Sequence, residues 1–175
     1  MKGFIHNYTG NGKGKTSAAL GLAIRALGAD KKVCLIQFLK NGEYSEIKAL
    51  DKIQKVFPDQ LYFCQTGTDR ELLSEMTKKD RIAALHGEEL FFHLLDENAY
   101  DLYILDELNT AVHYKLIDSK RLIQKIHSHE NHGEIVITGR YASDDLLNEA
   151  DLVTEMKKIK HYIDKGIEAR TGIEM

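Results

Sequence analysis

Short apolar runs alternate with longer amphipathic stretches along most of this chain of 175 residues. Six apolar runs predict β-strands, over residues 3–8, 32–38, 61–66, 101–107, 134–139 and 151–156. The stretches between them predict helices, most clearly over residues 15–27 and 78–98. Near-continuous apolar strands that alternate with helices are typical of a parallel sheet with both faces covered. The pattern therefore predicts an α/β fold, with a mostly parallel sheet flanked by helices on both faces.

The helix predicted over residues 78–98 has the clearest periodicity. Its apolar residues recur at helical spacing, at Ile82, Leu85, Leu90, Phe91, Leu94 and Leu95. This spacing predicts one face packed against the core, and the aromatic residues Phe91 and Phe92 are interpreted as core.

The chain is predicted to form a single domain over residues 1–175. A chain of this length buries roughly 70% of the surface that its unfolded form exposes. No linker, internal repeat or low-complexity tract divides the sequence. Because crossovers between parallel strands are right-handed, the loops that follow the strands are expected along one rim of the sheet.

Charge and cysteine content exclude several classes of protein. With 24 basic and 27 acidic residues the net charge is only -3, so nothing marks the chain as a nucleic-acid binder, and any anion site must be local. No apolar run reaches the ~20 residues of a membrane span. Cys34 and Cys64 lie in apolar runs without a C-x-x-C pair. They are interpreted as buried, reduced thiols, which favours a cytoplasmic location.

A glycine-rich stretch, GNGKGKT, follows the first predicted strand and opens the helix over 15–27. The usual phosphate-binding loop is G-x-x-x-x-G-K-[ST], and counting back from Lys15 places Thr9 where the first glycine should be. Measured from Gly10, the loop is one residue short, and it carries an additional lysine, Lys13. The sequence therefore predicts a phosphate loop of unusual length.

This loop has the parts of an anion site. Backbone N–H groups around Gly10, Gly12 and Gly14 are expected to form an anion nest at the positive end of the helix. Lys15 would reach phosphate oxygens, and the hydroxyl of Thr16 would bind Mg²⁺. A plain glycine-rich surface turn is the alternative, but a strand, this loop and an amphipathic helix occur here together.

Two later strand ends and one helix residue supply candidate partners. The strand over 101–107 ends in Asp106 and Glu107, which could reach Mg²⁺ directly or through water. The turn VITGR would place Thr138 and Arg140 near a nucleotide, although an ordinary turn explains it equally well. Arg25, on the helix after the loop, is either solvated or turned toward the nucleotide sugar or base.

The histidines of the segment HSHENH, at 127, 129 and 132, follow a helix and precede a strand, where exposed polar residues are expected rather than a metal site. His161 differs because it lies in the polar, glycine-punctuated stretch after Met156. This stretch is unlike either a helix or a strand, and we expect it to wrap the surface or to close a site.

Taken together, these pieces resemble the P-loop type corrinoid adenosyltransferases, which make adenosylcobalamin from ATP and a reduced corrinoid. The resemblance runs nearly end to end. It rests on the segments GNGKGKTSAA, RALG, IQFLKNG, LDELN, VITGR, ADLVTEM and the closing KH....GIEARTGIE.

The resemblance implies a RecA-like P-loop nucleotide-binding fold and an enzyme, an ATP:corrinoid adenosyltransferase. In this family Co(I) attacks the ribose C5′ of ATP and the triphosphate departs, so the loop must hold all three phosphates and leave C5′ exposed. The family is understood to bind ATP in the reverse sense to most P-loop proteins, which a shortened loop could accommodate. Lys13, Lys15, the loop amides and Mg²⁺ would neutralise charge on the departing triphosphate.

The same resemblance assigns roles to residues. Lys13, Lys15 and Glu107 are the predicted catalytic residues, and Thr16, Asp106 and Glu107 the predicted magnesium ligands. The predicted ATP-binding set comprises Gly10, Asn11, Gly12, Lys13, Gly14, Lys15, Thr16, Ser17, Arg25, Arg140, Lys160 and His161. Gly166 is expected to help complete the site with the last two.

The resemblance further implies a homodimer with the corrinoid between subunits, a flavoprotein as reductant, and no nucleic-acid or membrane partner. Some family members carry TGFTW after the third strand, with aromatic residues thought to displace the lower cobalt ligand. This chain has TGTDR there, ending in Arg70, and no tryptophan. Either Phe63 or Tyr44 substitutes, or the corrinoid lacks a lower ligand, or transfer to cobalamin is slower.

Three other functions share parts of this pattern. A P-loop ATPase or nucleotide-switched binding protein would release ADP and phosphate without a corrinoid. A small-molecule kinase would need an arginine-rich lid, for which only Arg70 and Arg81 are candidates. A corrinoid-delivery protein would bind both ligands and form no cobalt–carbon bond.

Overall fold

The computed structural model describes residues 3–69 and 75–174. Six strands form one sheet in the order β3-β2-β4-β5-β1-β6, and every neighbouring pair is parallel. The strands are β1 Ile5–Thr9, β2 Val33–Phe38, β3 Leu61–Thr66, β4 Leu102–Asp106, β5 Glu134–Thr138 and β6 Leu152–Glu155. The predicted α/β fold and its six strands are confirmed, with strand ends that differ by no more than two residues.

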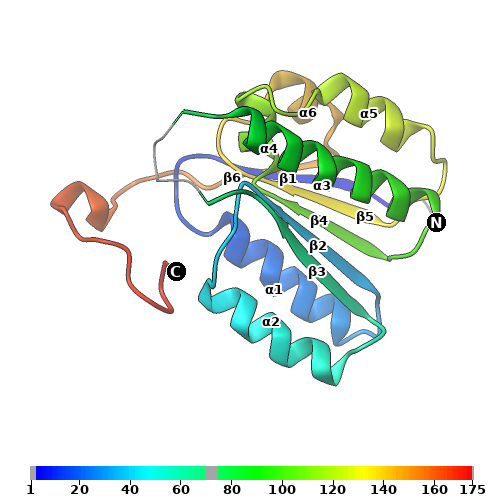
Figure 1. The fold of residues 1–175 in the computed structure, drawn as a ribbon, viewed down its shortest axis with the longest axis horizontal. Coiled ribbons are helices and arrows are strands. Elements are labelled where there is room, and N and C mark those ends of the chain that lie inside the picture. Colours follow the sequence, from blue (N-terminus) through cyan, green and yellow to red (C-terminus); the bar gives the residue numbers. More distant parts are fainter. Residues whose placement is uncertain (1–2, 70–74, 175) are drawn as a thin grey trace.

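Two layers of helices enclose most of the sheet (Figure 1). The helices are α1 Lys15–Leu27, α2 Ser45–Val56, α3 Lys78–Asp96, α4 Leu108–His113, α5 Ser119–His127 and α6 Asp144–Glu149. Helices α1 and α2 pack on one face, around Leu35 and Ile104, and the other four pack on the opposite face, around Tyr103 and Ile135. The sheet therefore separates two apolar cores.

The strand order determines which loops meet at the rim. Strand β5 lies between β1 and β4, and β4 lies between β5 and β2. Since parallel strands end on the same edge, the carboxyl ends of β1, β5, β4 and β2 stand side by side, about 5 Å apart from strand to strand. The loop after β1 and the acidic end of β4 are thus brought to one place.

Helix α3 faces the sheet with a different stripe than the apolar periodicity predicted. Phe91 and Leu95 are buried as expected, but Ile82 is 68% exposed. The side of α3 that faces the sheet includes Ala84 and Gly87. A Cβ added at Gly87 would lie 2.5 Å from the Thr66 hydroxyl oxygen. Small residues let the start of α3 approach β3 closely, so Ile82 lies on the outer side.

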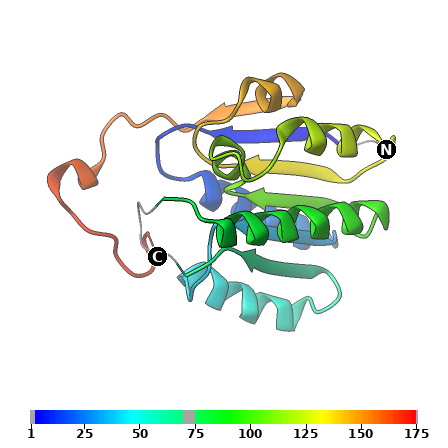
Figure 2. The same ribbon diagram turned by 45° about the horizontal axis from the view of Figure 1, so that its top comes forward.

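Strand β6 departs from the expectation of a sheet covered on both faces. All four of its residues are exposed, so β6 is an uncovered edge strand. After it, residues 157–174 leave the rim and loop away from the sheet, with one 3-10 turn, η1, at Tyr162–Lys165 (Figure 2). We call residues 157–174 the tail.

Both cysteines carry free thiols, as predicted. Cys34 is buried and Cys64 is half-buried, and burial raises the pKa of each thiol, so both remain protonated at neutral pH. Separately, no helix in the described ranges is long and apolar enough to cross a membrane.

Phe91→Ala should lower the free energy of unfolding by about 3–5 kcal/mol, because the Phe91 ring is fully buried and packs edge-on against Tyr103. Ile82→Ala, on the exposed side of the same helix, should change it by no more than about 0.5 kcal/mol. Denaturant unfolding of both variants measures the difference. Equal losses would contradict the described orientation of α3.

Candidate active site

The loop after β1 wraps around the side chain of Lys15. The Lys15 ammonium donates to the carbonyl oxygens of Gly10 and Gly12, each at 2.8 Å, and the residue is only 7% exposed. Burial lowers the pKa of Lys15, the Glu107 charge opposes this, and the Arg140 charge reinforces it. The loop thus holds a partly desolvated lysine beside Glu107 and Arg140, which is suited to an anionic ligand.

Two glycines of the loop pack against the residue that follows β6. The Gly12 N–H donates to the carbonyl oxygen of Met156 at 2.5 Å. A Cβ at Gly10 or Gly12 would lie 2.6 or 2.5 Å from that same oxygen. The Gly12 N–H is therefore directed to Met156, and not into an open anion nest as predicted from the sequence.

Gly14 has a different requirement. It precedes the first residue of α1 with φ at 116°, a conformation that favours glycine, and a Cβ there would meet nothing within 4 Å. Gly14 is thus required by the turn that starts α1 and Gly12 by close packing, whereas Gly10, with φ at 99°, is required by both its conformation and its packing.

Asp106, at the end of β4, is fully buried and accepts four hydrogen bonds. Its Oδ1 accepts from the hydroxyls of Thr16, at 2.8 Å, and Thr138, at 2.7 Å. Its Oδ2 accepts from Gln37 Nε2 at 3.0 Å and from Lys40 Nζ at 2.8 Å. Because Thr16 donates its proton to Asp106, the lone pairs of its hydroxyl oxygen are free for another partner, as a metal ligand requires.

A row of amides fixes the orientation of Asp106 from the other side. Gln65, Gln37 and Asp106 stand opposite one another on β3, β2 and β4. Gln65 Nε2 donates to Gln37 Oε1 at 3.1 Å, and the backbone N–H of Gly42 donates to Gln65 Oε1 at 3.1 Å. The carboxylate is thus connected by hydrogen bonds to the loop after β2.

Lys40 was not predicted as a site residue. Besides Asp106, its ammonium lies 3.5 Å from Glu46 and 5.7 Å from the centre of the Tyr44 ring. Burial acts to lower the pKa of Lys40, but Asp106, followed by Glu107 and Glu46, raises it overall. Lys40 lies in the motif IQFLKNG, two residues after the apolar run that forms β2. Its position beyond that strand end, beside the acidic end of β4, was the feature of the sequence that could have indicated its role.

Glu107 lies in the left-handed region, with φ at 61°. Its backbone N–H donates to Thr138 Oγ1 at 3.1 Å, and its carboxylate accepts from Thr110 at 2.7 Å. This conformation forms the turn from β4 into α4, whose N-cap residue is Glu107. The predicted metal residues Thr16, Asp106 and Glu107 are thus connected by hydrogen bonds, since Asp106 accepts from Thr16 and from Thr138, and Thr138 accepts from the backbone of Glu107.

A second unpredicted feature supports the rim from beneath. Asn7 on β1 and Asn109 on α4 are fully buried and exchange hydrogen bonds between their side-chain amides, at 3.1 and 2.8 Å. Asn109 also donates to the carbonyl oxygen of Gly139 at 3.3 Å. This pair joins the ends of β1, β5 and the start of α4. A polar Asn within the apolar run of β1 was the available signal.

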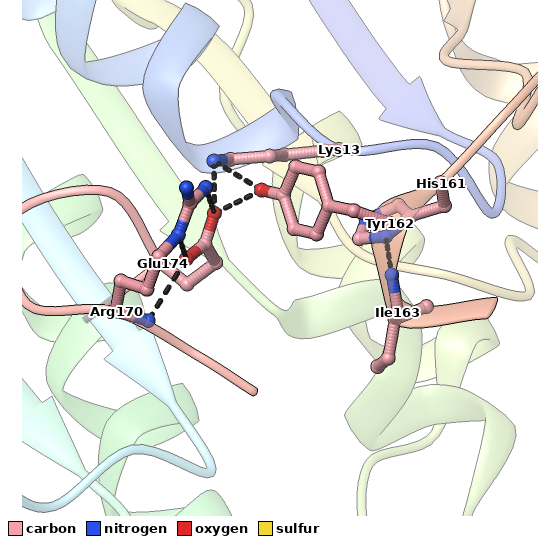
Figure 3. A network of polar contacts seen from close by, with 6 residues as sticks. All are labelled: Lys13, His161, Tyr162, Ile163, Arg170 and Glu174. Atoms are coloured by element: carbon pink, nitrogen blue, oxygen red, sulfur yellow. Dashed lines mark hydrogen bonds and ion pairs between the residues drawn. The ribbon is translucent and has the colours of Figure 1, made fainter. Parts of the chain in front are cut away.

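Lys13 points toward the tail (Figure 3). Its ammonium donates to Glu174 Oε1 at 2.8 Å and to the Tyr162 hydroxyl at 3.0 Å. His161 caps η1, accepting from the backbone N–H of Ile163 at 3.1 Å. The tail thus reaches the phosphate loop through Tyr162 and Glu174.

Five other predicted ATP-binding residues are exposed, and one of them, Arg140, lies close enough to Lys15 to affect its pKa. Asn11, Ser17 and Lys160 are exposed. Arg25 is exposed in the last turn of α1. Burial of the Tyr8 hydroxyl raises the pKa of Tyr8, and the nearby charge of Arg25 partly opposes this. Arg140 is exposed, and its backbone N–H donates to Thr110 at 3.2 Å.

The three histidines of HSHENH point to separate partners. His127 contacts Glu149, His129 lies 2.9 Å from Asp96, and the buried His132 lies 2.8 Å from the carbonyl oxygen of Gly133. Within residues 3–69 and 75–174, no group of three or more His, Cys, Asp or Glu side chains is arranged to hold a metal ion.

Thr68, shortly after β3, makes a structural contact. Thr68 donates to Asp80, which caps the start of α3. Arg70 lies outside the described residues, and Arg81 is exposed. Of the suggested aromatic substitutes, Phe63 packs against the core under α1 and α2, and Tyr44 lies beside Lys40.

Two cavities lie away from the phosphate loop. One of about 790 Å³ opens at the amino edge of the sheet and is lined by Phe4, His6, Lys32 and His132, among others. Another of about 410 Å³ lies beside the end of β3, between Thr66 and His86. The polar cluster at the carboxyl rim, rather than either cavity, has the groups for anion and metal chemistry.

The parallel sheet, its strand order and the loop between β1 and α1 are consistent with an α/β protein of the RecA-like P-loop class. The family model for ATP:corrinoid adenosyltransferase BtuR/CobO/CobP matches residues 1–175. The chain belongs to this family.

Curated relatives agree with that assignment. A corrinoid adenosyltransferase of Escherichia coli strain K12 is 32% identical over 177 residues, which cover 99% of this chain and 86% of the relative. The corrinoid adenosyltransferase CobA of Salmonella typhimurium strain LT2 is 33% identical, with the same coverage of both chains. A corrinoid adenosyltransferase of Pseudomonas aeruginosa is 31% identical and is covered over 84% of its length.

Lys40→Met should lower the free energy of unfolding by about 3 kcal/mol, because the buried Asp106 would lose its cationic partner. Lys48→Met is a matched control, because the Lys48–Glu43 ion pair is exposed. This substitution should change the free energy of unfolding by no more than about 0.5 kcal/mol. Chemical denaturation without added metal compares them. Equal effects would mean that Lys40 does not stabilise Asp106.

Proposed function

We propose that this protein transfers the 5′-deoxyadenosyl group of ATP to the Co(I) centre of a reduced corrinoid and releases triphosphate. Family membership over the whole chain is the observation that carries this proposal. The polar residues at the rim support the proposal. Lys13 and Lys15 are available for phosphates, and the Thr16 hydroxyl and the carboxylates of Asp106 and Glu107 are available for a divalent cation.

The proposed transfer forms one bond and breaks one. The electron pair of Co(I) attacks C5′ of the ribose, a cobalt–carbon bond forms, and the bond from C5′ to oxygen breaks. Cobalt becomes formally Co(III), and the departing electron pair remains on the triphosphate. Because the nucleophile belongs to the substrate, no side chain has to act as a general base.

The protein's role in this proposal is to bind, orient and compensate charge. Lys15, held by two loop carbonyls, would meet the triphosphate and stabilise the charge that develops as it leaves. Lys13 would assist from the same loop, and Arg140 would add charge near Lys15. Holding both reactants in line supplies the remaining advantage over solution.

Thr16, Asp106 and Glu107 fit a magnesium ion, because hydroxyl and carboxylate oxygens are its usual protein ligands. The donation from Thr16 to Asp106 leaves the threonine oxygen free to bind. Asp106 already accepts four hydrogen bonds, so it would reach the ion or a metal-bound water by exchanging one of these donors. When bound, Mg²⁺ would neutralise part of the triphosphate charge.

The remaining parts of the proposal concern partners. A homodimer with the corrinoid between its subunits and a flavoprotein reductant are proposed from the family resemblance. The exposed edge strand β6 and the tail, both beside the phosphate loop, are the surfaces available to complete such a site.

The experiment that tests the function mixes the protein with Mg-ATP and chemically reduced cobalamin. Phosphorus NMR should identify inorganic triphosphate as the product, and the corrinoid spectrum should change to that of a light-sensitive adenosylcorrinoid. ADP and phosphate with an unchanged corrinoid would refute the transferase and favour an ATPase.

Lys15→Ala should reduce the transfer rate by about 100-fold or more, because one cationic donor to the leaving group is lost. Lys48→Ala, on the exposed surface of α2, provides a control of equal size and charge change. Single-turnover kinetics with reduced cobalamin measures both rates. Near-normal transfer by the Lys15 variant would remove the proposed role of this lysine.

A further inference from the structure

The carboxylate of Glu174 collects donors from three places in the chain (Figure 3). Lys13 Nζ donates to it at 2.8 Å, the Tyr162 hydroxyl donates to the same oxygen, and Arg170 donates through its backbone N–H at 2.9 Å. The Arg170 side chain adds two contacts at 3.2 Å. These bonds, with Arg170 first, hold the pKa of Glu174 well below its usual range.

The same donors would suit a phosphate group. An ammonium, a guanidinium, a phenol hydroxyl and a backbone N–H are all donors, and they converge on one anionic group. The Tyr162 ring lies within reach of both cations, 5.7 Å from Lys13 Nζ and 4.8 Å from Arg170 Cζ. This arrangement keeps Lys13 and Arg170 near each other in spite of their like charge.

The cluster also adjoins the phosphate loop, to which Lys13 belongs. Lys13 is two residues from Lys15 in the phosphate loop, and the Gly12–Met156 hydrogen bond attaches the start of the tail to that loop. The Glu174 side chain is only 16% exposed, in a tail whose residues are otherwise mostly exposed. According to the proposed function, the Lys13 ammonium would contact a phosphate of ATP. In this structure it contacts the carboxylate of Glu174 instead.

We propose that Lys13, Tyr162 and Arg170 form an anion subsite that Glu174 fills in the nucleotide-free protein and that a phosphate of the bound triphosphate chain fills in its place. This inference rests on the proposed function insofar as it takes the triphosphate of ATP as the ligand. It adds Arg170 and Tyr162 to the phosphate-binding residues and makes Glu174 a competitor of the substrate.

A competitor within the chain lowers the affinity for the ligand, because part of the ligand's binding free energy is used to displace it. Removing the charge of Glu174 should therefore strengthen phosphate binding, and removing that of Arg170 should weaken it. If Glu174 and Arg170 only held the tail in place for the ligand, both changes would weaken binding. The opposite signs distinguish the two roles.

The test uses the full chain and isothermal titration with inorganic tripolyphosphate, which needs no corrinoid. Glu174→Gln keeps the size of the side chain and an acceptor oxygen for Tyr162 and Arg170. It should bind tripolyphosphate roughly two- to fivefold more tightly than the unaltered chain, the size of an exposed ion pair. Arg170→Met should bind it roughly fivefold more weakly.

Asp164→Asn supplies the matched control. It also removes one carboxylate from the tail, but Asp164 pairs with Lys158, 2.8 Å away, and not with the phosphate loop. Its affinity for tripolyphosphate should equal that of the unaltered chain. A general effect of net charge would instead strengthen binding in both carboxylate variants alike.

The inference is overturned if Glu174→Gln binds no more tightly than Asp164→Asn, if both main variants change affinity in the same direction, or if the unaltered chain does not bind tripolyphosphate. The adenosyl transfer assay is independent of these results. Tripolyphosphate binding with the expected signs but no cobalt–carbon bond would retain the subsite and refute the transferase, and the converse would refute only the subsite.

Discussion

The hydrogen bonding of one buried carboxylate organises the rim of this sheet. Asp106 is removed from water, and an ionised carboxylate in that position is tolerated only when donors surround it. The donors come from α1, β2, the residues after β2, and β5. Three stretches that are distant in the sequence, namely α1, β2 with the residues after it, and β5, are therefore held beside β4 by one side chain. Displacement of any of them would leave a charge without compensation in the interior.

The phosphate loop is held in a similar way, but by the backbone. Lys15 is bound by the carbonyls of its own loop, and the N–H of Gly12 is bound by Met156 at the end of the edge strand. The loop consequently has few degrees of freedom left to lose when a ligand binds, and this lowers the entropic cost of binding. By contrast, the tail beyond Met156 is joined to the loop by side-chain contacts of Lys13.

Much of the fold could be predicted because the strands are short apolar runs between clear turn signals. The order of the strands could not, since long-range pairing leaves no local trace in one sequence. The exposed position of Ile82 was missed because Ala84 and Gly87 face the sheet, and small residues contribute little to an apolar periodicity.

The candidate site was predictable where a residue lies inside a motif, as for Lys15, Thr16, Asp106 and Glu107. Lys40, Gln37 and the Asn7–Asn109 pair escaped prediction because their importance depends on which strands are neighbours. Gly12 lies in a motif but makes a different contact than expected, since nothing in the loop itself reveals that the Met156 carbonyl lies against it.

That contact couples the composition of the loop to the neighbouring strand. The space that a side chain at Gly10 or Gly12 would need is already filled by the carbonyl of Met156. A phosphate loop with a larger residue at either position could not be transplanted here unless β6 and the residues after it were moved as well. In evolution and in protein engineering, substitutions in the glycine loop would therefore have to be accompanied by changes at the end of β6.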